Sequence, residues 1–90
     1  MNTQELIQFY YAAFNHGDRA ATLALLTEDV IHDLNQGSRE VGLESFRAFV
    51  ERMDRSYSEK LHDIAIMVST DQNRAAAEYV VHGNYIADEK

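Results

Sequence analysis

The 90-residue chain has no cysteine, which excludes a disulfide framework, a thiolate nucleophile and a cysteine-type zinc site. Positive charge is also scarce, because 8 basic residues stand against 15 acidic ones and the formal net charge is -7. Such a chain is poorly suited to bind nucleic acid or an anionic membrane surface. The first residues, "MNTQELIQFYY", have neither the basic start nor the long apolar core of a signal peptide or membrane span. We expect a cytoplasmic protein.

The composition is that of an ordinary soluble globular protein, with 46% hydrophobic and 26% charged residues. It contains no low-complexity segment and no internal repeat. A chain of this size makes a single domain, here residues 1–90, and buries roughly two-thirds of the surface that its unfolded form exposes. Its core is therefore adequate without being large, and dimerisation would add to its stability.

The N-terminal third has the pattern of two consecutive helices. Asn2 followed by Glu5 resembles a capping box, Gly17 suits a left-handed helix end, and Asp18 is a good N-cap for a shorter helix over 19–26. The apolar positions that define one face of the first helix are Leu6, Ile7, Tyr10, Tyr11 and Phe14.

The rest of the chain alternates between strands and one long helix. Residues 30–35 predict a strand, residues 40–41 a brief extended piece, and Gly42 opens a third helix. After Tyr57 the spacing of apolar residues changes from a period near 3.6 to a period of two. This change predicts strands at 60–69 and 74–87 joined by the turn "TDQN". This order indicates an α+β fold, in which three helices pack on a curved, mostly antiparallel sheet. The third helix carries its apolar stripe at Leu43, Phe46, Phe49, Val50, Met53 and Tyr57.

Asp33 is the most informative polar residue, because it lies inside the apolar run "VIHDL". A buried carboxylate is costly unless it is hydrogen-bonded, paired or protonated. One interpretation is a strand-end carboxylate that caps the following turn. The other is a general base in a partly apolar pocket, with a nearby donor stabilising the enolate. His32 points to the opposite face of a regular strand, and we expect it to lie outside that pocket.

The tyrosines also allow two interpretations. Tyr10 is either a core aromatic whose hydroxyl finds a carbonyl or water, or a hydrogen-bond donor that lines a cavity. Tyr79 and Tyr85 share the more apolar face of the last strand. That face is the better candidate for the inner one, where aromatics would either line a ligand cavity or pack against helices.

The four histidines predict no metal site. His16, His32, His62 and His82 are dispersed, without the i, i+4 or adjacent-strand arrangement that metal ligands require. The segment "NQGS" is too short for a phosphate loop and has no lysine, and no nucleophile motif occurs.

The pattern over residues 5–86 resembles the SnoaL-like and ketosteroid isomerase-like proteins of the nuclear transport factor two-like superfamily. The shared features are a tyrosine-bearing helix, "N-x-G-D", a short helix ending "LL-x-E-D-V", a strand with an acidic residue, and a helix-opening glycine about nine residues later. The resemblance implies a cone-shaped α+β barrel with an apolar pocket at its wide end. Members normally continue for three further strands, so the chain is expected to represent the N-terminal two-thirds of the fold.

The same resemblance assigns roles to particular residues. Tyr10 falls at the oxyanion-hole tyrosine and Asp33 at the general base of the isomerases. Independently of the resemblance, the residues expected to bind a ligand are Asn35, Phe14, Tyr79 and Tyr85. The second oxyanion donor has no counterpart, and His32 and Leu34 stand where isomerases usually have an acidic residue and a proline. The implied protein needs no cofactor, forms a homodimer through the sheet, and binds a small hydrophobic or ring-containing molecule.

Two functions remain open at this point. The first is an isomerase-, cyclase- or lyase-type enzyme in which Asp33 moves a proton and Tyr10 stabilises an oxyanion. The second is a non-catalytic ligand-binding or dimerisation module. The two differ in geometry, because only the enzyme requires both side chains to open on one cavity.

Overall fold

The computed structural model describes residues 1–34 and 37–86. The predicted α+β class, with three helices and antiparallel strands, is confirmed. No helix of these described residues is long and apolar enough to cross a membrane. The elements are α1 (Thr3–His16), α2 (Arg19–Ala24), β1 (Ile31–Asp33), β2 (Arg39–Val41), α3 (Leu43–Ser56), β3 (Tyr57–Val68) and β4 (Ala75–Tyr85).

The two N-terminal helices are delimited as the sequence predicts. The Asn2 side chain accepts from the Glu5 amide at 2.8 Å, and Glu5 accepts from the Asn2 amide at 3.0 Å, which completes the capping box. Gly17 has a φ of 73°, the left-handed conformation that ends α1. Asp18 accepts from the Ala21 amide at 3.1 Å and caps α2. The second helix is two residues shorter than predicted at its C-terminal end.

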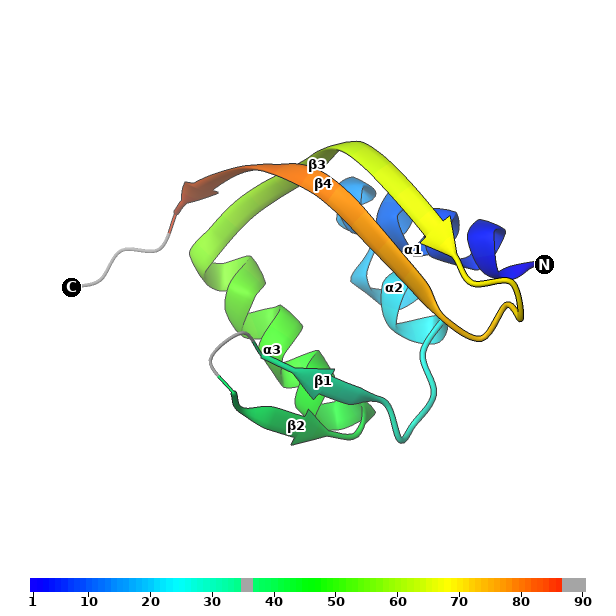
Figure 1. Cartoon of the computed structure of the whole chain (residues 1–90). Helices are drawn as coiled ribbons and strands as arrows, with labels where there is room; N and C mark the ends of the chain where they lie inside the picture. The colour runs from blue at the N-terminus through cyan, green and yellow to red at the C-terminus, as the bar shows by residue number, and fades with distance from the viewer. Residues whose placement is uncertain (35–36, 87–90) are drawn as a thin grey trace.

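The strands form two antiparallel ribbons in the described part of the chain, β1 with β2 and β3 with β4. Figure 1 shows the long β3–β4 ribbon arching over the molecule, with α1 and α2 beneath its turn end. From the start of β3, α3 runs down to the short β1–β2 ribbon (Figure 1). The homodimer expected through the sheet stays a prediction.

The β3 strand begins three residues earlier than the periodicity predicts. Tyr57 follows the last residue of α3 directly and pairs with Tyr85. The Ile86 amide donates to the Ser56 carbonyl at 2.7 Å and closes this end of the ribbon. Pairing with β4 therefore places residues 57–59 in the strand, although their sequence lacks a strong strand pattern.

A β-bulge in β3 changes which residues face the helices. The register shifts between His62 and Ala65, and Asp63 has a φ of 55°, a left-handed conformation that aspartate tolerates better than most residues. Before the bulge Leu61 is buried, and after it Ile64 and Ile66 are half-buried while their neighbours are exposed. The extra residue thus keeps apolar side chains on the inner face along the whole strand.

Asn15 fixes the ribbon to α1. Its side-chain amide donates to the Leu61 carbonyl at 2.9 Å, and its side-chain oxygen accepts from the Leu61 amide at 2.8 Å. Asn15 therefore supplies both hydrogen bonds that a neighbouring strand would give to that residue. Lys60 adds a third connection, because its ammonium donates to the Asn15 carbonyl. The Leu61 side chain is only 7% exposed, so this connection sits at the buried centre of the fold.

We predict that Asn15→Ala lowers the free energy of unfolding by about 1–3 kcal/mol, the cost of leaving half-buried backbone groups without a partner. Urea unfolding followed by circular dichroism measures this loss. The control is Gln8→Ala, an amide-to-alanine change at an exposed position of the same helix, which should stay within about 0.5 kcal/mol of the unchanged chain. Equal stability of the two variants would contradict the role of Asn15.

Candidate functional site

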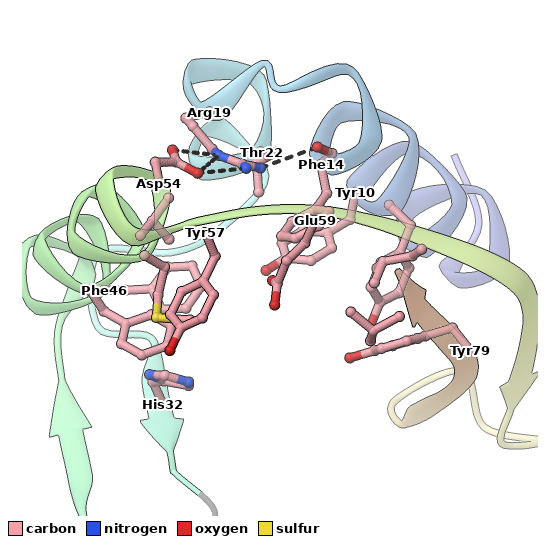
Figure 2. A pocket seen from close by; sticks show the side chains of 16 residues that line it. Tyr10, Phe14, Arg19, Thr22, His32, Phe46, Asp54, Tyr57, Glu59 and Tyr79 are labelled. Carbon is pink, nitrogen blue, oxygen red and sulfur yellow. Dashed lines mark hydrogen bonds and ion pairs between the residues drawn. The ribbon is translucent and has the colours of Figure 1, made fainter. Parts of the chain in front are cut away.

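A cavity of about 430 Å³ lies between α1, α3 and the inner face of the β3–β4 ribbon (Figure 2). This volume is within the roughly 300–1,000 Å³ typical of small-molecule sites. The apolar and aromatic side chains that line the cavity are Tyr10, Tyr11, Phe14, Phe46, Phe49, Val50, Met53, Tyr57, Leu61, Tyr79 and Val81. The polar residues that line it are Arg19, Thr22, His32, Asp54 and Glu59.

Aromatic rings from distant segments meet in this cavity. Tyr10 contacts Tyr11 edge to face, with ring centroids 5.2 Å apart, and Tyr11 contacts Tyr79 of β4 at 5.5 Å. Tyr79 and Val81 belong to the face of the last strand that the sequence favours as the inner one. Flat rings at these distances offer stacking and edge contacts to a ring-containing ligand.

Tyr10 lies on the inner side of α1, as the helical spacing predicts. Burial, together with the nearby Tyr11 and Tyr79, raises the pKa of its phenol above the usual 10.0. The group is therefore a hydrogen-bond donor at neutral pH. Among the described residues no hydrogen bond fixes the Tyr10 hydroxyl, which leaves it able to donate to a ligand.

Two carboxylates that the sequence did not indicate line the cavity, and of these Asp54 is paired with Arg19 while Glu59 forms no ion pair with the described residues. Glu59 is half-buried on β3, and Figure 2 shows its carboxylate directed into the cavity. The residue paired with it on β4 is Gly83, where a Cβ atom would come within 3.0 Å of the Glu59 Cγ. Glycine at that position leaves the space that the Glu59 side chain fills. The available signal was its alternation with Tyr57 and Leu61, but the predicted strand began one residue too late to include it.

His32 also lines the cavity, contrary to the expectation that it would lie outside the pocket. Its ring packs 4.6 Å from the Phe49 ring and 5.0 Å from the Phe46 ring, centroid to centroid. On its other side, Nδ1 lies 3.4 Å from a Glu40 carboxylate oxygen across the β1–β2 ribbon. The prediction that His32 and Asp33 point to opposite faces is correct, but the inner face is the one that carries His32.

Asp33 is placed outside this cavity, at the exposed end of β1. Arg39, its partner in the β1–β2 register, donates to both carboxylate oxygens at 2.6 and 3.1 Å. The side chain is 61% exposed, and the Arg39 hydrogen bonds hold the pKa of the carboxyl below its ordinary value. Tyr10 and Asp33 therefore do not open on one cavity in this structure, because strand alternation turns Asp33 outward.

The remaining predicted binding residues divide into three groups. Phe14 and Tyr79 line the cavity. Tyr85 does not, and its ring instead contacts Tyr57, with centroids 5.3 Å apart. Asn35 lies outside the described residues.

One end of the cavity is held by a charged contact between helices. The Arg19 guanidinium donates to both Asp54 carboxylate oxygens, at distances from 2.7 to 3.0 Å. The same guanidinium lies 4.5 Å from the centre of the Phe14 ring and donates to the Phe14 carbonyl. These contacts join the ends of α1 and α3 to the start of α2, so the cavity wall has a fixed geometry on this side.

Comparison with known proteins identifies the family of the chain. A sequence profile of the SnoaL-like domain matches residues 7–90. The chain belongs to the SnoaL-like family. No curated protein matches it significantly.

Three solved structures of SnoaL-like fold resemble the chain closely. All three are described as proposed polyketide cyclases. The protein from Pseudomonas putida is 57% identical, with a TM-score of 0.95 over 100% of this chain and 68% of that one. Those from Xanthomonas campestris and a Silicibacter species are 52% and 44% identical, each with a TM-score of 0.91. The two matches cover 97% and 99% of this chain, respectively, and 65% of each solved chain.

These similarities confirm the expected SnoaL-like, α+β fold. The SnoaL-like chain spans about two thirds of the length of the solved chains that it matches.

We predict that the Asp33 carboxyl titrates below 3.8, the ordinary aspartate value. Its pairing with Arg39 contributes stability that is present above that value and is lost as the pH falls through the lowered pKa. Carbon-detected NMR titration measures this, and Arg39→Gln should return the pKa toward 3.8. Titration of Asp33 above its ordinary value would contradict the placement, since it would indicate an apolar pocket.

Proposed function

We propose that the SnoaL-like chain binds a small, mostly apolar, ring-containing molecule in the cavity and catalyses a proton transfer next to a carbonyl group. The observation that carries the proposal is the meeting of the tyrosine donor Tyr10 and the carboxylate of Glu59 in one aromatic-lined cavity. Apolar walls with a few convergent polar groups are typical of small-molecule sites. The proposed polyketide cyclase function of the solved relatives supports a substrate with several carbonyl groups.

Glu59 is the proposed general base. A carboxylate can remove a proton from a carbon next to a carbonyl, and such a group contributes about 10²- to 10⁴-fold to a rate. The enolate that forms requires a hydrogen-bond donor, and Tyr10 remains protonated in the same cavity. In a cyclase the enolate carbon attacks a second carbonyl, and the oxygen of that carbonyl takes up the proton that Glu59 removed. In an isomerase Glu59 returns the proton to another carbon of the same enolate. Neither reaction requires a cofactor.

His32 is the proposed third polar group of the site, after Glu59 and Tyr10. The Glu40 carboxylate beside Nδ1 favours the tautomer in which Nδ1 carries the proton. Nε2 is then an acceptor on a ring already held between Phe46 and Phe49. Nε2 could therefore accept a hydrogen bond from a hydroxyl group of the ligand. This bond would orient the ligand so that its carbonyl group faces Glu59 and Tyr10.

Binding is tested first, with a hydroxylated naphthalene as the probe and tyrosine fluorescence as the signal. We predict that Tyr79→Ala weakens binding by about tenfold, because a stacked aromatic pair contributes about 0.5–1.5 kcal/mol beyond its buried area. The matched control is Tyr85→Ala, which removes the same side chain from the same strand outside the cavity lining. Equal losses in both variants, or no binding to the unchanged chain, would contradict the assigned cavity.

Proton transfer is tested by deuterium exchange at the carbon next to the carbonyl of a small ring ketone such as 2-tetralone, followed by NMR. We predict that Glu59→Gln slows the exchange by at least about 10²-fold, and that Tyr10→Phe also slows it. Asp33→Asn makes the same carboxylate-to-amide change outside the cavity and is compared in parallel.

The difference between the exchange rates of Glu59→Gln and Asp33→Asn identifies the general base. Loss of exchange in Asp33→Asn alone would return the catalytic role to Asp33 and overturn the role of Glu59. If the unchanged chain binds the probe but does not exchange the proton, the proposed catalytic function is wrong. The chain would then be a ligand-binding module, the alternative that the outward placement of Asp33 favours.

A further inference from the structure

Two histidines meet on the outer face of the long ribbon. His62 of β3 pairs with Val80, and His82 of β4 pairs with Lys60, so the two histidines are diagonal neighbours across the strands. Their ring centroids are 4.4 Å apart and their planes are inclined at 64°. Strand alternation puts this pair on the face opposite to Tyr79 and the cavity. The pair is therefore separate from the proposed catalytic site.

The surroundings of the pair leave both imidazoles open to a ligand. Both residues are exposed, and within residues 1–34 and 37–86 neither imidazole forms an ion pair. They border a shallow surface hollow together with Ser58, Lys60 and Asn84. Hydrogen bonds of the ribbon hold the two backbones in register, so little flexibility is lost when both rings bind one ion.

We propose that His62 and His82 together bind a divalent transition-metal ion of the nickel, copper and zinc class. Neutral imidazole is a favoured ligand of these ions. No group of three or more histidine, cysteine or acidic side chains in the described residues could hold a metal, so water must complete the coordination. The net charge of -7 attracts cations to the molecule. The ammonium of the neighbouring Lys60 is engaged by the Asn15 carbonyl.

The expectation that no histidines are arranged on adjacent strands is wrong for His62 and His82, because 20 positions separate them in the sequence and only the strand register brings them together.

The test is calorimetric titration of the chain, prepared without a histidine tag, with NiCl₂ and separately with ZnCl₂ at neutral pH. We expect saturable, equimolar binding that weakens by at least about tenfold in His62→Gln and in His82→Gln, since metal sites lose 10–100-fold affinity even when an outer-shell partner is removed. The control is His16→Gln, an exposed histidine at the end of α1, which should bind as the unchanged chain does.

NMR of the imidazole protons adds a readout that does not depend on stability. Nickel should broaden the signals of His62 and His82 together, before those of His16 and His32. Failure of binding to saturate, loss in only one of the two variants, or equal loss in the control would overturn the proposal.

Discussion

The attachment of Leu61 to Asn15 is the contact on which the rest of the structure depends. A two-stranded ribbon is marginally stable on its own in water, and here one half-buried amide side chain completes the hydrogen bonding of a central residue of β3. These hydrogen bonds fix the separation between the ribbon and α1. That separation determines how far Tyr10 on the helix lies from Tyr79 on β4, and so how wide the cavity between them is.

The same constraint explains the "N-x-G-D" segment. Asn15 holds the ribbon, Gly17 ends α1 in a left-handed conformation, and Asp18 caps α2. The Arg19 that follows then reaches Asp54 at the end of α3. Four nearby residues thus fix three helices and one strand around the cavity, and each does so through a different physical interaction.

Strand alternation determines which polar side chains face the cavity and which face the solvent. In the β1–β2 ribbon the outward position holds a solvent-exposed ion pair, Asp33 with Arg39, whose net contribution to stability is small. The inward position holds His32 between two phenylalanine rings. Glu59 enters from β3, where Gly83 leaves room for it. The cavity therefore combines apolar walls with a few groups able to accept or donate a proton.

Local signals made much of the fold predictable. The capping box, the left-handed Gly17 and the amphipathic stripe of α3 depend on residues a few positions apart, so sequence spacing was enough. The α+β class followed from the change of period after Tyr57. The more apolar face of the last strand, which carries Tyr79, is the one that faces the cavity, although alternation alone left open whether its aromatic rings line a cavity or pack against helices.

The parts that failed depend on pairing between distant segments. Alternation showed that His32 and Asp33 face opposite ways, but only the packing of β1 against α3 determines which of them faces inward. Glu59 was missed because its strand is extended by pairing with β4, and the His62–His82 contact exists only in the ribbon register. The bulge at Asp63 adds a shift of face that simple alternation does not include.

The proposed ligand site is the aromatic cavity between α1, α3 and the ribbon. Intermolecular nuclear Overhauser effects between a bound hydroxynaphthalene and the methyl groups of the chain test it most directly. The account predicts contacts to Met53 and Val81, which line the cavity. Contacts to Met67 and Ile86, which are 47% and 56% exposed and lie outside the cavity lining, would contradict it.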